Sequence, residues 1–178
     1  LNNAGKLLGA NDLTLVAGTL NNSKSLAAGG TLSIAGDNLD IDNAKDATIQ
    51  ANRLVLSGNR LVNKGTIQGG AAADSTLSFD TLENAADATL TLADEAAGGG
   101  SINVRRLDND GTLQSYGSLT VNYSAAIDNA KTLLSGGAMT LRSTSAGGRI
   151  DVGGSGTLQA GGVLDIDAAD GGRGVVLD

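Results

Sequence analysis

The sequence predicts an all-β fold, a β-helix solenoid of about eight rungs, and three observations predict it. A short pattern, Leu-x-Asn with Leu or Ile a few residues later, returns every 19 to 25 residues along the 178-residue chain. A second pattern, apolar-x-apolar, returns once in each interval. The chain also contains 27 glycines and no proline, whereas a strand that is hydrogen-bonded on both sides must donate the amide that proline lacks.

The first pattern is seen in "LNNAGKLL" at 1–8, "LVNKGTIQ" at 61–68, "LDNDGTLQ" at 107–114 and "IDNAKTLL" at 127–134. Aligned two residues before the asparagine, the repeats have a mean step of 22 residues and begin at Leu1, Leu20, Ile41, Leu61, Leu82, Leu107, Ile127 and Val152, with Leu177 opening a ninth. The asparagine recurs in seven of the eight copies, as Asn3, Asn22, Asn43, Asn63, Asn84, Asn109 and Asn129, and the eighth copy has Gly154.

The second pattern is a triplet whose middle residue is usually polar. Its copies are Leu13–Leu15, Leu32–Ile34, Leu54–Leu56, Leu77–Phe79, Ile102–Val104, Leu119–Val121, Met139–Leu141 and Leu164–Ile166. Period-two alternation predicts strands, and no helical periodicity persists. A fixed period near 20 with short strands is typical of a solenoid, and the consensus of leucine-rich repeats is missing. Eight rungs at about 4.8 Å each would make a stack about 38 Å long.

The core is expected to be narrow and aliphatic, because the only aromatic residues are Phe79, Tyr116 and Tyr123. We interpret Tyr116 and Tyr123 as edge packing. The repeated asparagine is interpreted as a corner residue, since asparagine tolerates left-handed backbone geometry and Gly154 replaces it once. Stacked amides can also hydrogen-bond from rung to rung, as in cross-β structures. We therefore predict an architectural asparagine ladder.

The composition excludes several classes of site. Without cysteine or histidine there is no disulfide, thiolate or imidazole chemistry, and we expect no cofactor or metal. The net charge is −7 and the densest basic feature is the pair Arg105 and Arg106, so nucleic acid is not an expected partner. No apolar run approaches a membrane span, and no leader precedes Leu1, so we expect residues 1–178 to be one segment of a longer shaft that is not inserted in a membrane.

Recognition, if present, is expected on the longer connections, because loops on rigid scaffolds often bind partners. These are 68–76, 93–101, 142–149 and 167–174. The candidate binding residues are Asp94, Glu95, Arg105, Arg106, Arg142 and Arg149, with solvated surface as the alternative for each. Calcium at 36–46 is disfavoured, since strand alternation spreads Asp40 and Asp42 along one face.

An enzyme is the competing class, since a β-helix can be a polysaccharide lyase or hydrolase. Such enzymes use paired carboxylates and usually aromatic platforms for sugar rings. The chain has no tryptophan and only two tyrosines. We therefore do not expect an enzyme.

The rungs "LNNAGKLLGANDLTLVAG", "LVNKGTIQGG" and "LDNDGTLQSYGSLTV" resemble the haemagglutinin repeats of filamentous haemagglutinin and of contact-dependent growth-inhibition exoproteins. The resemblance covers nearly the whole chain. It implies a right-handed parallel β-helix from the shaft of a two-partner-secreted, Gram-negative surface or secreted protein, with an outer-membrane transporter as partner. The Asn-Pro motifs of the secretion domain and the toxin-boundary motif "VENN" are missing, so only the shaft is represented.

The expected function is that of a structural stalk, which holds a distal adhesin or toxin module away from the cell. Its partners within the protein would be the neighbouring rungs. The alternative is a segment that recognises a cell-surface receptor or glycan through the inserted loops.

Overall fold

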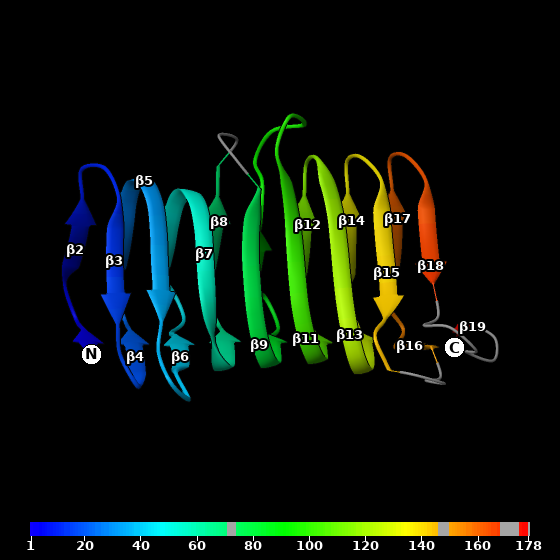
Figure 1. The fold of residues 1–178 in the computed structure, drawn as a ribbon, viewed down its shortest axis with the longest axis horizontal. Helices are drawn as coiled ribbons and strands as arrows, with labels where there is room; N and C mark the ends of the chain where they lie inside the picture. The colour runs from blue at the N-terminus through cyan, green and yellow to red at the C-terminus, as the bar shows by residue number, and fades with distance from the viewer. Residues whose placement is uncertain (71–73, 146–149, 168–174, 178) are drawn as a thin grey trace.

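The computed structural model describes residues 1–70, 74–145, 150–167 and 175–177. These residues form a single 19-stranded sheet system in which every strand pairing is parallel, and they contain no helix. The chain coils so that successive rungs lie side by side along the long axis (Figure 1). The solenoid makes about seven turns, close to the eight rungs expected, and the all-β prediction is confirmed.

Three columns of stacked strands make up the solenoid. The asparagine column contains β1 (Asn2–Asn3), β4 (Thr19–Asn22), β6 (Asp40–Asn43), the last parts of β7 (Thr48–Asn63), β9 (Ser75–Asn84), β11 (Gly99–Asn109) and β13 (Ser118–Asn129), then β16 (Ile150–Gly153) and β19 (Val175–Leu177).

The threonine column follows each asparagine corner. It contains β2 (Lys6–Gly9), the first parts of β5 (Ser25–Ala35) and β7, then β8 (Thr66–Gly69), β10 (Thr89–Thr91), β12 (Thr112–Ser115), β14 (Thr132–Ser135) and β17 (Thr157–Ala160). The triplet column contains β3 (Leu13–Val16), the second part of β5, the middle of β7, the first parts of β9, β11 and β13, then β15 (Met139–Ser143) and β18 (Leu164–Asp167).

The asparagine column has the register that the repeat alignment predicts. Leu20 pairs with Ile41, and Ile41 pairs with Leu61. The same pairing continues rung by rung to Val152 and Leu177. Crossover connections between parallel strands are right-handed in nearly all proteins, and the right-handed sense of this coil stays a prediction.

The triplet column departs from a simple alignment of triplets. Leu77 pairs with Leu56, not Leu54, and Ile102 pairs with Val121, not Leu119. A two-residue shift leaves every side chain on the same face of the strand, because the side-chain period is two. The hydrophobic pattern therefore fits both registers, and the triplets alone cannot distinguish them.

The core is a stack of leucine, isoleucine and valine side chains inside the coil, but it also holds two aromatic rings. Phe79 is buried, and Tyr123 is fully buried, so the interpretation of Tyr123 as edge packing is wrong. Its neighbours along the column are Val104 and Ser143, whose smaller side chains leave room for a ring. Tyr116, by contrast, is exposed.

Two features are absent from the described part of the chain. No helical segment there has the length and hydropathy of a bilayer span. Nor do three or more carboxylates gather there in a way that could hold a metal ion.

Candidate functional site

The seven repeated asparagines form one continuous column of side chains inside the corner of the coil. In the first six, Nδ2 donates to the Oδ1 of the asparagine on the next rung, so these donors all point toward the C-terminal end. The six donor–acceptor distances are 2.8 Å for Asn3 to Asn22, 2.8 Å for Asn22 to Asn43, 2.8 Å for Asn43 to Asn63, 2.9 Å for Asn63 to Asn84, 2.8 Å for Asn84 to Asn109 and 2.7 Å for Asn109 to Asn129.

Each of these amides also holds the backbone of the following rung. Asn63 Nδ2 donates to Thr89 O at 3.0 Å, and Asn109 Nδ2 donates to Thr132 O at 2.8 Å. The asparagines are at most 9% exposed, and four of them are completely buried. A buried polar group that loses its partner is costly, so each asparagine fixes both the side chain and the backbone of the rung beside it.

The interpretation of the repeated asparagines as corner residues with left-handed backbone geometry is wrong. Among the described residues, the non-glycine residues with positive φ are Asn38, Asp46 and Asp87, and none of these belongs to the ladder. Each ladder asparagine is instead the last residue of a strand, as Asn22 is in β4. Asparagine therefore fits this position through its side-chain hydrogen bonds rather than through left-handed geometry.

The ladder stops at Asn129, where the next rung has Gly154. Asn129 Nδ2 donates to Thr157 O at 3.1 Å and has no asparagine above it. Gly154 has a φ of 105°, and a Cβ placed there would lie 2.3 Å from Asn129 O. A residue with a side chain would therefore be strained at this corner, which glycine accommodates.

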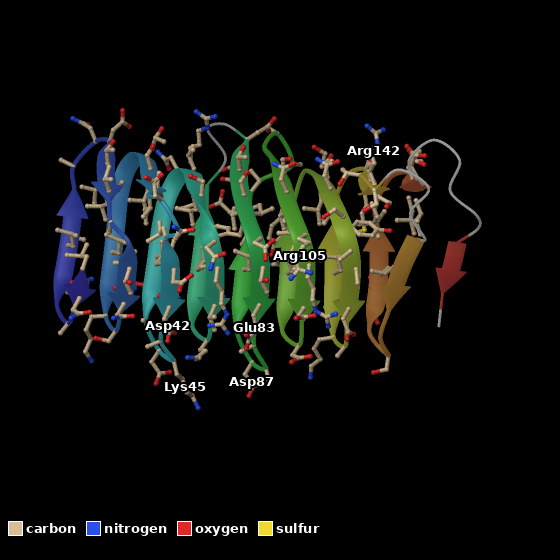
Figure 2. All side chains as sticks on the ribbon, turned by 60° about the horizontal axis from the view of Figure 1, so that its bottom comes forward. Asp42, Lys45, Glu83, Asp87, Arg105 and Arg142 are labelled. Atoms are coloured by element: carbon tan, nitrogen blue, oxygen red, sulfur yellow. The ribbon has the colours of Figure 1, made fainter. Side chains whose placement is uncertain are left out.

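The candidate binding residues named from the sequence do not converge. Arg105 lies at the bend of β11 and Arg142 lies on β15, well apart from each other (Figure 2). Asp94 and Glu95 lie in the connection between β10 and β11. Arg149 lies outside the described residues.

The three described arginines of this set are held by carboxylates. Arg105 Nε lies 3.0 Å from Asp80 Oδ1, and Arg142 Nε lies 3.2 Å from Asp167 Oδ2. Arg106 Nη2 lies 2.6 Å from Asp108 on its own rung and 3.7 Å from Asp128 on the next. Arg60 with Glu83 and Lys64 with Asp42 make further pairs between rungs. Pairs this exposed contribute little each, and they do not form an anion site.

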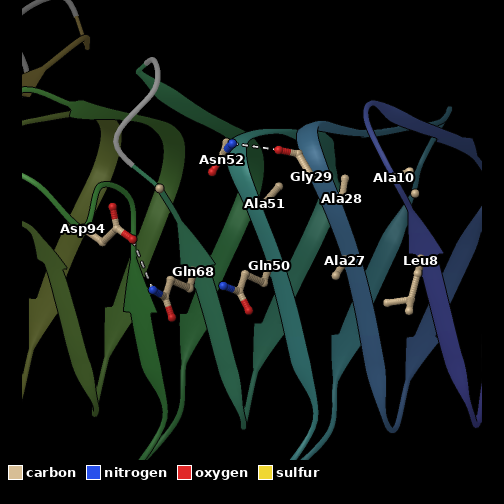
Figure 3. Close-up of a pocket in the computed structure, with 12 residues that line it drawn as sticks. Leu8, Ala10, Ala27, Ala28, Gly29, Gln50, Ala51, Asn52, Gln68 and Asp94 are labelled. Atoms are coloured by element: carbon tan, nitrogen blue, oxygen red, sulfur yellow. Dashed lines mark hydrogen bonds between the residues drawn. The ribbon is translucent and has the colours of Figure 1, made fainter.

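A hollow of about 650 Å³ lies open on the outer side of the threonine column, at the corner that leads to the triplet column. Figure 3 shows Leu8, Ala27, Gln50 and Gln68 in one row across it. Asp94, one of the residues predicted from the sequence, closes one end, and its Oδ2 lies 3.5 Å from Gln68 Nε2. Gln68 and Gly70 fall within the connection 68–76 that was expected from the sequence. The other residues of the hollow were not predicted, since they lie on the first three rungs, which have no inserted loop.

The sequence comparisons agree with one another. The haemagglutinin repeat family matches residues 96–154 and 142–177. A protein of Escherichia coli named Toxin CdiA is 32% identical over 120 residues, which is 64% of this chain. A protein of Dickeya dadantii (strain 3937) named Deoxyribonuclease CdiA is 36% identical over 149 residues, which is 81% of this chain. The chain spans about 4% of the length of each of these relatives. No solved structure matches the sequence.

Proposed function

The chain is a haemagglutinin-repeat segment of the filamentous haemagglutinin and CdiA type, and from this premise we propose that it is a structural stalk. The stalk belongs to a large exoprotein that is secreted by, or displayed on, a Gram-negative bacterium. An outer-membrane transporter is its partner during export. The stalk extends a distal adhesin or toxin module away from the cell, and the segment itself is not an enzyme.

The observation that carries this proposal is the continuity of the asparagine ladder. Six hydrogen bonds between identical buried amides join seven successive rungs. In a solenoid each repeat contacts only its neighbours, and stability is approximately a sum over those contacts. A segment that repeats one contact from rung to rung suits a part whose function is length and stiffness.

The name of the Dickeya relative, a deoxyribonuclease, does not argue for catalysis here. The present chain spans about 4% of that protein, so its named activity can reside elsewhere in it. Polysaccharide-cleaving β-helices use paired carboxylates and usually aromatic platforms. Tyr123 is buried in this chain, which leaves Tyr116 as its exposed tyrosine.

Deleting one rung from the parent exoprotein tests the proposal. Removal of residues 64–84 joins Asn63 to Ala85 and keeps one asparagine per corner. We expect the shortened exoprotein to be secreted and to attach to its target cells as the parent does, because a stalk tolerates a change of length. A control that removes residues 64–74 cuts within a rung and should impair secretion. Normal secretion of the one-rung deletion with loss of attachment would make the segment a recognition element instead.

A further inference from the structure

The outer side of the threonine column is uncharged from β5 to β17, whereas its first strand, β2, carries Lys6. From β5 to β17, the strand segments of this column contain no charged residue. The asparagine column, in contrast, carries Asp40, Asp42, Arg60, Glu83 and Arg106 on its strands. From β5 to β17, the described strand segments thus carry their charges away from this side of the coil.

Two rows of outward side chains run along this uncharged side, which we name the threonine–glutamine face. The first row begins with Lys6 and Ser25 and continues in register with Thr48, Thr66, Thr89, Thr112, Thr132 and Thr157. The second row holds Leu8, Ala27, Gln50, Gln68, Thr91, Gln114, Leu134 and Gln159, of which Thr91 is buried.

The hollow in this face exists because one member of the second row is small. Ala27 lies between Leu8 on the rung before and Gln50 on the rung after. The side chains of both neighbours are longer and extend farther from the strand than the methyl group of Ala27. Leu8 is 63% exposed, which is unusual for a leucine of this protein and makes an apolar wall. Ala28 and Ala51 add to the apolar floor.

The opposite wall of the hollow is polar. The exposed Gln50 side chain extends toward Gln68, and the Gln68 amide extends toward Asp94 (Figure 3). Asn52 donates its Nδ2 to Gly29 O at 2.7 Å, which orients the amide at the rim. Asp94 is the one charged residue among those that line the hollow, and no cation lines it.

This combination of walls matches an uncharged sugar better than other small ligands. A pyranose ring presents an apolar patch of C–H groups and an edge of hydroxyls, and amides both donate to and accept from hydroxyls. The carboxylate of Asp94 would repel sulfated or uronic sugars. The rungs repeat at about 4.8 Å, and two adjacent rungs present the same pair, Thr48 with Gln50 and Thr66 with Gln68, to an extended glycan strand.

We propose that the hollow at Ala27 and the threonine–glutamine face bind an uncharged, extended oligosaccharide strand that lies along the axis of the solenoid. One sugar ring enters the hollow between Leu8 and Gln50, and the following rings lie over the next rungs. This binding site goes beyond the stalk function and does not depend on it.

Nuclear magnetic resonance titration of the 178-residue chain tests the site with three probes. Cellohexaose is extended and neutral, maltohexaose is curved and neutral, and a heparin-derived hexasaccharide is extended and anionic. We expect cellohexaose to shift the side-chain amide signals of Gln50 and Gln68, and to bind at least about tenfold more tightly than either other probe.

Matched variants on one strand locate the site. Ala27→Leu fills the hollow and should weaken cellohexaose binding at least about tenfold. Ala35→Leu places the same side chain at an exposed position of β5 in the triplet column, and it should leave binding unchanged. Gln50→Ala should also weaken binding, because it removes an amide from the polar wall without touching the core.

Four results would overturn the proposal. These are the absence of shifts with cellohexaose, equal or tighter binding of the heparin probe, undiminished binding by Ala27→Leu, and self-association of the chain through this face in place of sugar binding. Sedimentation velocity over a range of protein concentrations detects the last of these.

Discussion

Replacing Asn63 by leucine removes the middle of the asparagine ladder. Asn63 is fully buried, accepts from Asn43 at 2.8 Å and donates to Asn84 at 2.9 Å and to Thr89 O at 3.0 Å. Leucine has a similar size and no polar atom. The substitution therefore leaves the volume of the corner nearly unchanged and isolates the contribution of the hydrogen bonds.

The magnitude follows from the partners that are left behind. Asn84 Oδ1 loses its amide donor in a buried site, which costs about 1 to 3 kcal/mol. Asn43 Nδ2 loses one acceptor but keeps its bond to Thr66 O at 3.2 Å, so the loss there is smaller. We expect Asn63→Leu to lower the free energy of unfolding by about 2 to 4 kcal/mol in total.

Urea denaturation followed by far-UV circular dichroism measures this loss. With a denaturant slope of about 2 kcal/mol per molar, the midpoint should fall by about 1 to 2 M. The control is Asn59→Leu on the same strand, since Asn59 is exposed and its side chain donates to the exposed Asp40 Oδ1 at 3.0 Å. Surface changes of that kind stay within about 0.5 kcal/mol. Equal midpoints for the two variants would refute the claim that the ladder stabilises the coil.

Three further substitutions have expected outcomes. Asn63→Asp keeps two acceptors and loses the donor, and burial should raise the pKa of the new carboxyl. The stability of the variant should therefore be closest to that of the parent below about pH 4 and should fall as the pH rises through the folded-state pKa. Urea midpoints measured between pH 3 and 8 would detect this loss. Gly154→Asn restores the repeat pattern in sequence, yet it should lower the thermal midpoint, because its Cβ would lie 2.3 Å from Asn129 O; a raised midpoint would contradict the geometry. Arg105→Ala should change the free energy of unfolding by less than about 1 kcal/mol in urea, because Arg105 and Asp80 are both about half exposed.

The asparagine column could be predicted from the sequence because its residues are nearly identical from rung to rung. A residue such as Asn84 that recurs at one place in each repeat must stack on its copies once the chain coils, and the register of Leu82 with Leu107 follows from the same recurrence. The repeat also predicted parallel strands without helix, since triplets such as Leu32–Ile34 alternate with period two.

The features that the sequence did not reveal depend on neighbours across rungs. The burial of Tyr123 is set by the smaller Val104 and Ser143 beside it, and their pairing needs the two-residue shift that alternation cannot specify. The hollow at Ala27 is likewise a difference in length between side chains on successive rungs. Asp94, and Gln68 and Gly70 within the connection 68–76, could be placed in candidate loops in advance, because inserted loops are visible in sequence.

Electron cryotomography of the parent exoprotein on the cell surface tests the stalk most directly. Seven register steps separate Leu20 from Leu177, so a second copy of residues 20–176 adds seven rungs in register. At about 4.8 Å per rung, the distal tip should move about 34 Å farther from the membrane, and attachment to target cells should be retained. An unchanged tip distance, or a longer filament that no longer attaches, would contradict the stalk function.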